Sequence, residues 1–172
     1  MIVYVASPLG LSEAGRAFYR QRLLPALRRA RYTVLDPWSS EAGARIESER
    51  RRPYSRERRG VLALANAAAA RANQEAIDRA DAVVAVLDGP DVDSGTAAEI
   101  GYAFGRGKPI VGYRGDFRLA GDNEGAVVNL QVEYFVRASG GTVVARLADV
   151  PRALSRARPR PRRAASSSRR TR

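Results

Sequence analysis

The sequence predicts an α/β fold in which a five-stranded parallel sheet is covered by helices on both faces. Short, β-branched apolar runs alternate with longer segments of helical periodicity over the first 157 residues. The clearest run, residues 82–87, is flanked by Asp81 and Gly89 and is typical of a strand buried on both faces. Strands that alternate with helices imply parallel pairing through helical crossovers.

The first strands and the helix between them follow from this periodicity. Residues 2–6 and 32–35 are expected to form strands. The helix is expected at residues 12–31, with Ser12 as its N-cap. Its expected inward positions recur at helical spacing and are Ala17, Phe18, Leu24, Leu27 and Ala30.

The next segment, residues 36–59, is expected to be a loop. It lacks apolar periodicity, is rich in Arg and Glu, and contains Pro37 and Pro53. Because a loop of this length is uncommon inside a domain unless it has a function, we interpret it as a lid or binding loop. An Ala-rich helix then covers residues 60–79.

The carboxyl-terminal half repeats the alternation and ends in a basic tail. Residues 158–172 lack apolar residues to bury and should be disordered, so the predicted domain covers residues 1–157. A second loop is expected at residues 115–128. The remaining strands are predicted at 82–87, 109–113 and 142–145, and the helices at 96–104, from about 130, and at 149–156.

Composition excludes several kinds of active site. The chain contains neither His nor Cys, which excludes Ser-His-Asp and Cys-His nucleophiles, thiolate metal sites and disulfides. We expect no metal and no cofactor. No apolar span of membrane-crossing length and no signal-like leader is visible, so we expect a cytoplasmic protein without a membrane partner.

The net charge of +12 is concentrated near the carboxyl terminus. Residues 151–172 hold nine Arg and no acidic residue, and so account for nine of the twelve charges. A basic tail can contact nucleic acid, but unpatterned tails of like charge are usually solvated. Because Lys108 is the only Lys of the chain, we interpret the Arg content as a compositional bias and expect no nucleic-acid partner.

The most informative segment follows residues 82–87 and runs from Asp93 to Glu99 as Asp-Ser-Gly-Thr-Ala-Ala-Glu. We expect Glu99 in the first turn of a helix, just beyond the carboxyl end of a strand, where open α/β sheets bind ligands. The helix dipole would stabilise its anion, which suits a nucleophile better than a general acid. The alternative is a simple capping carboxylate.

With other motifs, this segment resembles the nucleoside 2-deoxyribosyltransferase family. The likeness covers roughly residues 1–150 and implies a flavodoxin-like fold that cleaves the N-glycosidic bond of 2′-deoxynucleosides. The implied partners are a deoxynucleoside and a nucleobase. The motifs are Ile2-Val3-Tyr4-Val5-Ala6-Ser7-Pro8, the strand after Asp81, the block Asp93 to Ala103, Gly107-Lys108-Pro109-Ile110-Val111-Gly112-Tyr113, and Val128-Asn129-Leu130.

The resemblance also implies roles for single residues. Glu99 would be the nucleophile, which traps the oxocarbenium-like sugar as a covalent ester before a second base or water attacks it. Asp93 would bind the 5′-hydroxyl, with Gly95 of the same block also at the substrate. Tyr4 would lie near the nucleophile, or only in the core. Asn129 would contact the sugar of a neighbouring subunit, which implies a homo-oligomer, a dimer or a hexamer; it can also cap the next helix.

One position departs from the family pattern. The family has an Asp eight residues before the Asp that opens the third strand, where it helps to protonate the departing base; here that position is Asn73. An amide cannot act as a general acid. We therefore expect Asn73 to recognise a base edge, or to be an exposed helix residue, and Asp88 to supply the proton.

A sister group offers the main alternative function. The 2′-deoxynucleoside 5′-monophosphate N-glycosidases bind the phosphate with serines, and Ser7 lies in a small-residue loop that could cradle a phosphate. That group has a Ser six residues before the catalytic Glu, where this chain has Asp93, whose charge would repel a phosphate. Free nucleosides are thus favoured. The non-enzyme alternatives are a nucleoside- or nucleotide-binding module and tail-mediated association with nucleic acid.

Overall fold

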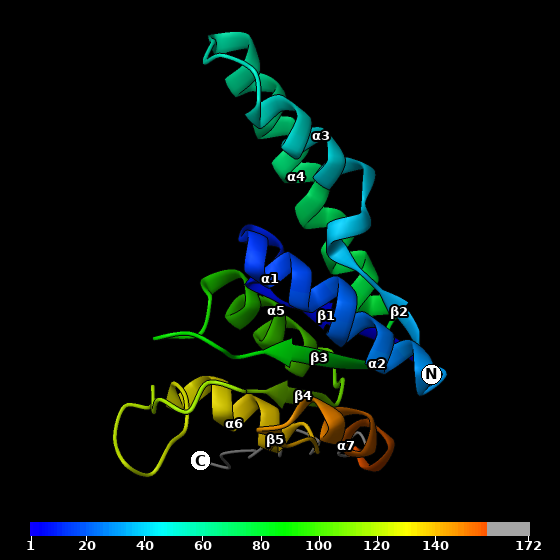
Figure 1. Cartoon of the computed structure of the whole chain (residues 1–172), viewed down its shortest axis with the longest axis vertical. Coiled ribbons are helices and arrows are strands. Elements are labelled where there is room, and N and C mark those ends of the chain that lie inside the picture. The colour runs from blue at the N-terminus through cyan, green and yellow to red at the C-terminus, as the bar shows by residue number, and fades with distance from the viewer. Residues whose placement is uncertain (158–172) are drawn as a thin grey trace, which may run out of the picture.

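A parallel sheet with the strand order β2-β1-β3-β4-β5 forms the centre of the molecule (Figure 1). The structure is a computed structural model and describes residues 1–157, so the expected tail lies outside the described residues. All four strand pairs are parallel, and this order is flavodoxin-like, which confirms the predicted fold class. The strands are β1 Ile2–Ala6, β2 Thr33–Leu35, β3 Ala82–Val86, β4 Ile110–Tyr113 and β5 Val143–Val144.

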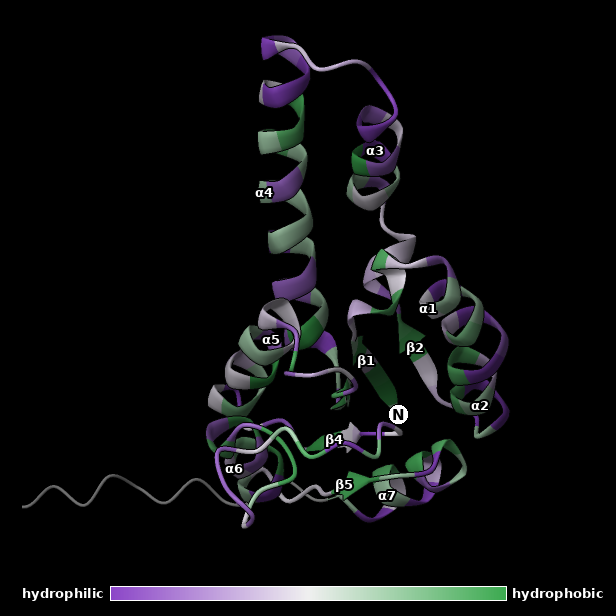
Figure 2. Cartoon of the chain, turned by 60° about the vertical axis from the view of Figure 1, so that its left-hand side comes forward, coloured by the Kyte–Doolittle hydropathy of each residue, from purple (hydrophilic) through white to green (hydrophobic). Residues whose placement is uncertain are grey.

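Helices cover both faces of the sheet because successive strand residues point to opposite sides. Val3 and Val5 pack with α1, α2 and α7, whereas Tyr4 and Ala6 pack with α4, α5 and α6. Figure 2 shows the apolar strands in green between these layers. The helices are α1 Glu13–Phe18, α2 Leu24–Arg29, α3 Glu41–Arg50, α4 Arg56–Arg79, α5 Ser94–Gly105, α6 Leu130–Ala138 and α7 Val150–Arg156.

The first predicted helix is interrupted by a π-helical turn at Tyr19–Leu23 between α1 and α2. Ser12 caps it as expected, by accepting a hydrogen bond from the Gly15 N–H at 3.0 Å. Pro25 lacks an N–H and cannot continue an α-helical ladder, and the wider turn just before it accommodates this gap. The turn shifts the buried face, so Tyr19 and Leu23 are buried while Ala17, expected to point inward, is exposed.

The prediction of a loop at residues 36–59 is wrong, because most of that segment is helical. A short 3₁₀ turn, Pro37–Ser39, leads into α3, and α4 begins at Arg56 rather than at residue 60. Ser40 and Ser55 cap these helices by accepting the N–H groups of residues 43 and 58 at 3.1 and 3.0 Å. Apolar periodicity is absent because the segment has little core to face.

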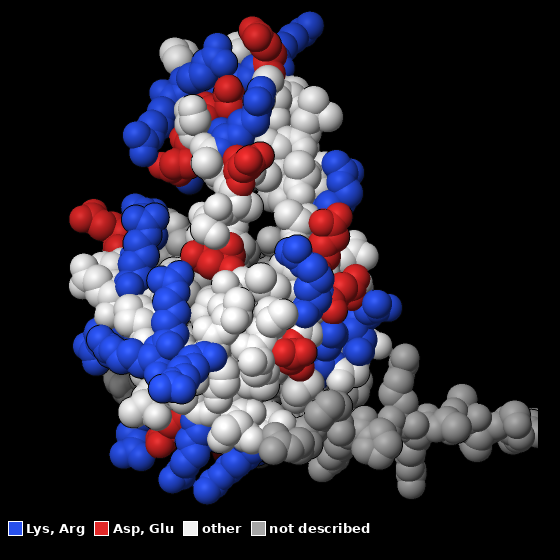
Figure 3. Space-filling view, turned by 90° about the vertical axis from the view of Figure 1, so that its right-hand side faces the viewer, with Lys and Arg blue, Asp and Glu red and all other residues white. Residues whose placement is uncertain are grey.

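The hairpin of α3 and α4 projects from the body of the protein (Figures 1 and 2). Only Ala65 and Ile77 are buried along the whole of α4. Charged side chains of both signs gather over its tip, as the upper part of Figure 3 shows, and Glu47 pairs there with Arg51 at 3.2 Å. Surface ion pairs at this spacing support a helix without burial, which a search for apolar periodicity cannot detect.

The other predicted elements agree with the structure to within about two residues, apart from the start of α5 discussed below. Residues 114–129 contain no helix or strand, as expected for the second loop. The fifth strand, β5, is the shortest and lies at one edge of the sheet. Among the described residues, no helix combines the length and apolarity needed to cross a membrane.

Two glycines give a test of the fold. A Cβ added to Gly141 would lie 1.7 Å from the carbonyl oxygen of Ile110, whereas one added to Gly60, in α4, meets no atom within 4 Å. We expect Gly141→Ala to lower the free energy of unfolding by about 1–3 kcal/mol through overpacking. Gly60→Ala should raise it by about 0.5–1 kcal/mol. Urea titration measures both, and a Gly141→Ala protein as stable as wild type would contradict this packing of β5.

Candidate active site

Glu99 is the centre of a polar cluster built from three separate elements. Its Oε1 accepts a hydrogen bond from the Tyr4 hydroxyl at 2.6 Å and another from the Asn73 side-chain amide at 3.1 Å. Tyr4 comes from β1, Asn73 from α4 and Glu99 from α5. Within residues 1–157, Oε2 of Glu99 takes part in no hydrogen bond.

Tyr4 serves both of the roles considered for it. It is fully buried in the core of the sheet, and its hydroxyl reaches Glu99. Burial raises the pKa of this phenol far above its usual range, and the negative charge of Glu99 raises it further. Tyr4 is therefore a permanent hydrogen-bond donor at neutral pH, and it fixes the orientation of the carboxylate.

Glu99 lies in the second turn of its helix and not, as the sequence predicted, in the first. Helix α5 begins at Ser94, so Glu99 is its sixth residue and no acidic residue lies in the first turn. Because the dipole effect fades beyond the first turn, it is not the main source of stabilisation for the anion. Burial is the main reason that the pKa of Glu99 is raised, and the charge of Asp93 adds to this effect. The hydrogen bonds from Tyr4 and Asn73 lower the pKa and offset part of the rise.

Asp93 is the N-cap of α5, which explains the earlier start of the helix. Its Oδ2 accepts hydrogen bonds from the N–H and the hydroxyl of Thr96 at 2.9 and 3.2 Å. Its Oδ1 makes no hydrogen bond in the described part of the chain. A Cβ on Gly95 would lie 3.2 Å from Oδ2, so this glycine leaves the cap uncrowded.

Trp38, which the sequence did not indicate as a site residue, closes the loop after β1. Ser7 Oγ accepts the Leu9 N–H at 3.1 Å, and the Ser7 carbonyl accepts the indole N–H of Trp38 at 3.2 Å. The indole ring lies against Gly10, where a Cβ would come within 2.1 Å of it. Ser7 thus shapes a turn next to the cluster. In the sequence, only the position of Trp38 just after β2 could have indicated its role.

Asp36, at the carboxyl end of β2, was also missed. Its Oδ1 accepts a hydrogen bond from the buried hydroxyl of Tyr19 at 2.8 Å and one from the Trp38 N–H at 2.9 Å. Its charge contributes to the raised pKa of Tyr4. With Glu99 and Asp93, it adds a third carboxylate near this end of the sheet, where a cationic group would be stabilised.

Asp88 is not joined to the Glu99 cluster by any hydrogen bond or ion pair among the described residues. Its Oδ1 instead accepts the backbone N–H of Asp116 at 2.9 Å and fastens the loop after β4 to the end of β3. The buried guanidinium of Arg114 makes a second fastening, because it donates to the carbonyl oxygens of Leu87, Gly89 and Arg118. The loops that flank the site are therefore tied together.

Asn129 likewise makes no contact with Glu99 within the described chain. It caps α6, because its Oδ1 accepts the N–H groups of Gln131 at 3.0 Å and Val132 at 3.4 Å. It lies at the end of the loop that follows β4. Residues 1–157 contain no group of three or more acidic side chains that could hold a metal ion.

This geometry suits nucleophilic attack by a carboxylate. One oxygen of Glu99 is held by two donors, and the other is open beside further negative charge. A buried anion with a free oxygen can attack an electron-poor carbon and stabilise a developing cation.

Comparison with known proteins connects the chain with one enzyme family. The family model described as nucleoside 2-deoxyribosyltransferase matches residues 3–131. No curated protein matches the sequence. The matched segment contains Tyr4, Asn73 and Glu99 as well as the cap Asp93.

Solved structures share the fold at low sequence identity. The 2-desoxiribosyltransferase from Leishmania mexicana is 20% identical, with a TM-score of 0.58 and coverage of 90% of this chain and 94% of that one. The 2-deoxyribosyltransferase from Bacillus psychrosaccharolyticus is 22% identical, with a TM-score of 0.56 and coverage of 88% and 90%. A CMP N-glycosidase from Clostridium botulinum is 16% identical, with a TM-score of 0.50 and coverage of 90% and 98%.

The two hydrogen bonds to Glu99 predict how its pKa responds to mutation. Both bonds lower this pKa, so Tyr4→Phe should raise it, and Asn73→Ala should raise it by less. A ¹³C NMR titration of the glutamate side chains measures the change, with Glu99 assigned from the Glu99→Gln variant. Asn129→Ala, which removes only the cap of α6, is the control. An unchanged pKa in Tyr4→Phe would show that the bond is not formed in solution.

Proposed function

Because the chain belongs to the nucleoside 2-deoxyribosyltransferase family, we propose that it cleaves the N-glycosidic bond of 2′-deoxyribonucleosides and transfers the sugar to another nucleobase or to water. The observation that carries this proposal is the environment of Glu99, whose Oε1 is held by Tyr4 and Asn73 while Oε2 is free. The family is one of enzymes, and the cluster supplies the nucleophile that such a reaction needs.

The proposed reaction proceeds in two displacements. Glu99 Oε2 bonds to C1′ of the sugar while the C1′–N bond breaks, and the base leaves with the electron pair. A nitrogen of a second base, or water, then attacks C1′ and releases Glu99 as a carboxylate. The missing 2′-hydroxyl makes the cationic transition state easier to reach, and the carboxylates around Glu99 stabilise it.

The nucleophile must be ionised, and its burial works against ionisation. The acid limb of the pH–rate profile should therefore lie above the ordinary range of a glutamate. The hydrogen bonds from Tyr4 and Asn73 limit this cost, because both favour the charged form.

The departing base still needs a proton, and Asn73 cannot supply it. The amide of Asn73 is directed to Glu99, which supports a role in holding the nucleophile beside any contact with the base. We keep Asp88 as the proposed donor. It is half-buried at the end of β3, and only one of its oxygens is engaged in the described structure.

Asp93 supports a free nucleoside as the substrate. Its Oδ1 has no partner in residues 1–157 and can accept the 5′-hydroxyl, while a 5′-phosphate would meet like charge. Gly95 and Ser7 would line the same side. The alternative is a 5′-monophosphate N-glycosidase, and the fold is shared with an enzyme named for CMP.

The assembly and the limits of the domain are also proposals. Asn129 makes no hydrogen bond with Glu99 among residues 1–157, and we propose that it contacts the sugar bound by a second copy, in a homo-oligomer in the cytoplasm. We propose the catalytic domain as residues 1–157, with the Arg-rich segment dispensable for catalysis.

Removing the nucleophile tests the reaction itself. Glu99→Ala should lower cleavage of the best deoxynucleoside by several orders of magnitude, because it removes the carboxylate that is proposed to form the ester. Glu75→Gln, an exposed carboxylate of α4, is the matched control and should keep full activity. Chromatography of base and nucleoside products measures both. Near-wild-type turnover in Glu99→Ala would exclude Glu99 as the nucleophile.

Asp93 decides between the two substrates. Asp93→Ser keeps an N-cap residue for α5 but removes the charge, so it should weaken nucleoside cleavage and improve the relative kcat/KM of the 5′-monophosphate by about tenfold to a hundredfold. Asp93→Asn also keeps a capping residue and removes the charge, but it adds no hydroxyl. Comparing it with Asp93→Ser therefore separates the effect of losing the charge from the effect of gaining a hydroxyl. Both substrates are assayed at fixed ionic strength. A wild-type preference for the monophosphate would favour the nucleotide N-glycosidase instead.

A further inference from the structure

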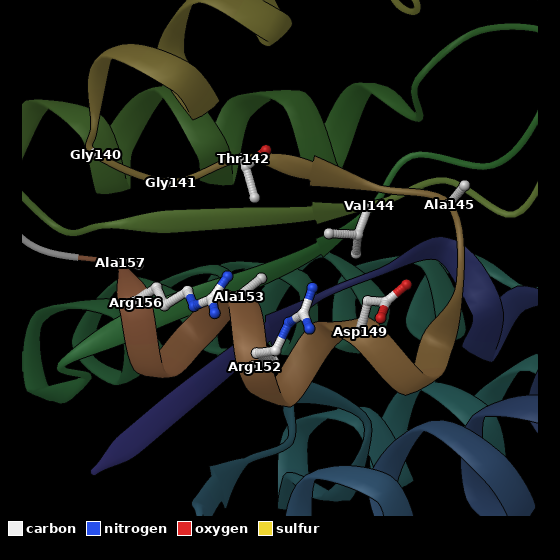
Figure 4. Close-up of a pocket in the computed structure, with 10 residues that line it drawn as sticks. All are labelled: Gly140, Gly141, Thr142, Val144, Ala145, Asp149, Arg152, Ala153, Arg156 and Ala157. Atoms are coloured by element: carbon white, nitrogen blue, oxygen red, sulfur yellow. The ribbon is translucent and has the colours of Figure 1, made fainter.

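A crevice between β5 and α7 lies apart from the Glu99 cluster. It has a volume of about 350 Å³, and the chain from Ala145 to Asp149 joins its two walls at one end (Figure 4). β5 is the edge strand, and both β3 and β4 separate it from β1, which carries Tyr4. The crevice is therefore not part of the proposed nucleoside site.

The wall formed by α7 is charged. Asp149, Arg152 and Arg156 lie on the face of the helix that lines the crevice, while Val150 and Leu154 are buried in the core. In Figure 4 both guanidinium groups rise from α7 into the space below β5. The opposite wall contributes the side chains of Thr142 and Val144.

The positive charge of this wall is not neutralised within the described structure. Asp149 is engaged by Arg146 at 2.8 and 3.3 Å, and this contact lowers its pKa, with a smaller contribution from the charge of Arg152. Arg152 and Arg156 have no carboxylate within ion-pair distance among residues 1–157. The crevice thus presents two free guanidinium groups one helical turn apart.

This arrangement is unfavourable without a ligand. Like charges at positions i and i+4 destabilise a helix by a few tenths of a kcal/mol, and both arginines, although exposed, line the same crevice. An arginine in the last turn interacts well with the helix dipole, which accounts for Arg156 alone. It does not account for a second arginine directed into the crevice beside it.

We propose that the crevice binds a phosphate group, either as inorganic phosphate or as part of a small phosphate monoester. Guanidinium groups match phosphate oxygens in paired hydrogen bonds, and two of them can hold one dianion from the same side. The volume leaves room for a sugar-sized group beside the phosphate.

The test uses the full-length protein and NMR signals local to the crevice. Inorganic phosphate is titrated at constant ionic strength, and the backbone amides of Gly141, Thr142 and Val144 are followed. We expect saturable shifts that weaken by about tenfold or more in Arg152→Gln/Arg156→Gln. Arg20→Gln/Arg29→Gln removes the same charge from exposed positions and should bind as wild type does.

A second titration with deoxyribose 5-phosphate distinguishes the two sources of phosphate. Tighter binding than inorganic phosphate, lost in the same double variant, identifies a monoester site, and equal binding identifies a site for free phosphate. The proposal is overturned if wild type shows no saturable shift. It is equally overturned if Arg152→Gln/Arg156→Gln binds as wild type does, since binding would then come from other arginines. Glu99→Ala should leave this binding unchanged, so the outcome is independent of the proposed reaction.

Discussion

The burial of β1 and β3 on both faces is the constraint on which the structure depends. Each strand must place apolar side chains on alternate sides, so Tyr4 points toward α4 and α5 while Val3 and Val5 point toward α1 and α7. Parallel pairing then brings the carboxyl ends of all strands to one edge. The polar cluster lies near this edge because α5 follows β3 and carries Glu99 in its first half.

The candidate site balances burial against hydrogen bonding at Glu99. Burial makes the charged form costly, and Tyr4 and Asn73 recover part of that cost by donating to one oxygen. The same bonds leave the second oxygen free and oriented. An asparagine at residue 73 is consistent with this balance, because an amide can donate to the carboxylate, whereas an ionised aspartate there would repel Glu99.

Local patterns located the elements wherever one face of an element had to be buried. They failed where another force decided the structure. The π turn before Pro25 is set by a missing N–H, and it replaced Ala17 by Tyr19 on the inner face. The α3–α4 hairpin is held by serine caps and ion pairs on a projecting arm, so the apolar periodicity that identifies a core helix is missing.

The sequence by itself determined the strand–helix alternation and the parallel sheet, because these depend on burial periodicity, and a contiguous motif identified Glu99 as the candidate site residue. Tertiary structure alone decided which groups touch the carboxylate. Tyr4 and Asn73 are separated from Glu99 by 95 and 26 positions, and their hydrogen bonds depend on how β1 and α4 pack against α5. The tertiary structure also decided that Asp88 binds the backbone of the loop after β4 and, among the described residues, makes no hydrogen bond with Glu99. A side chain's partners are set by distance in space and not by order along the chain.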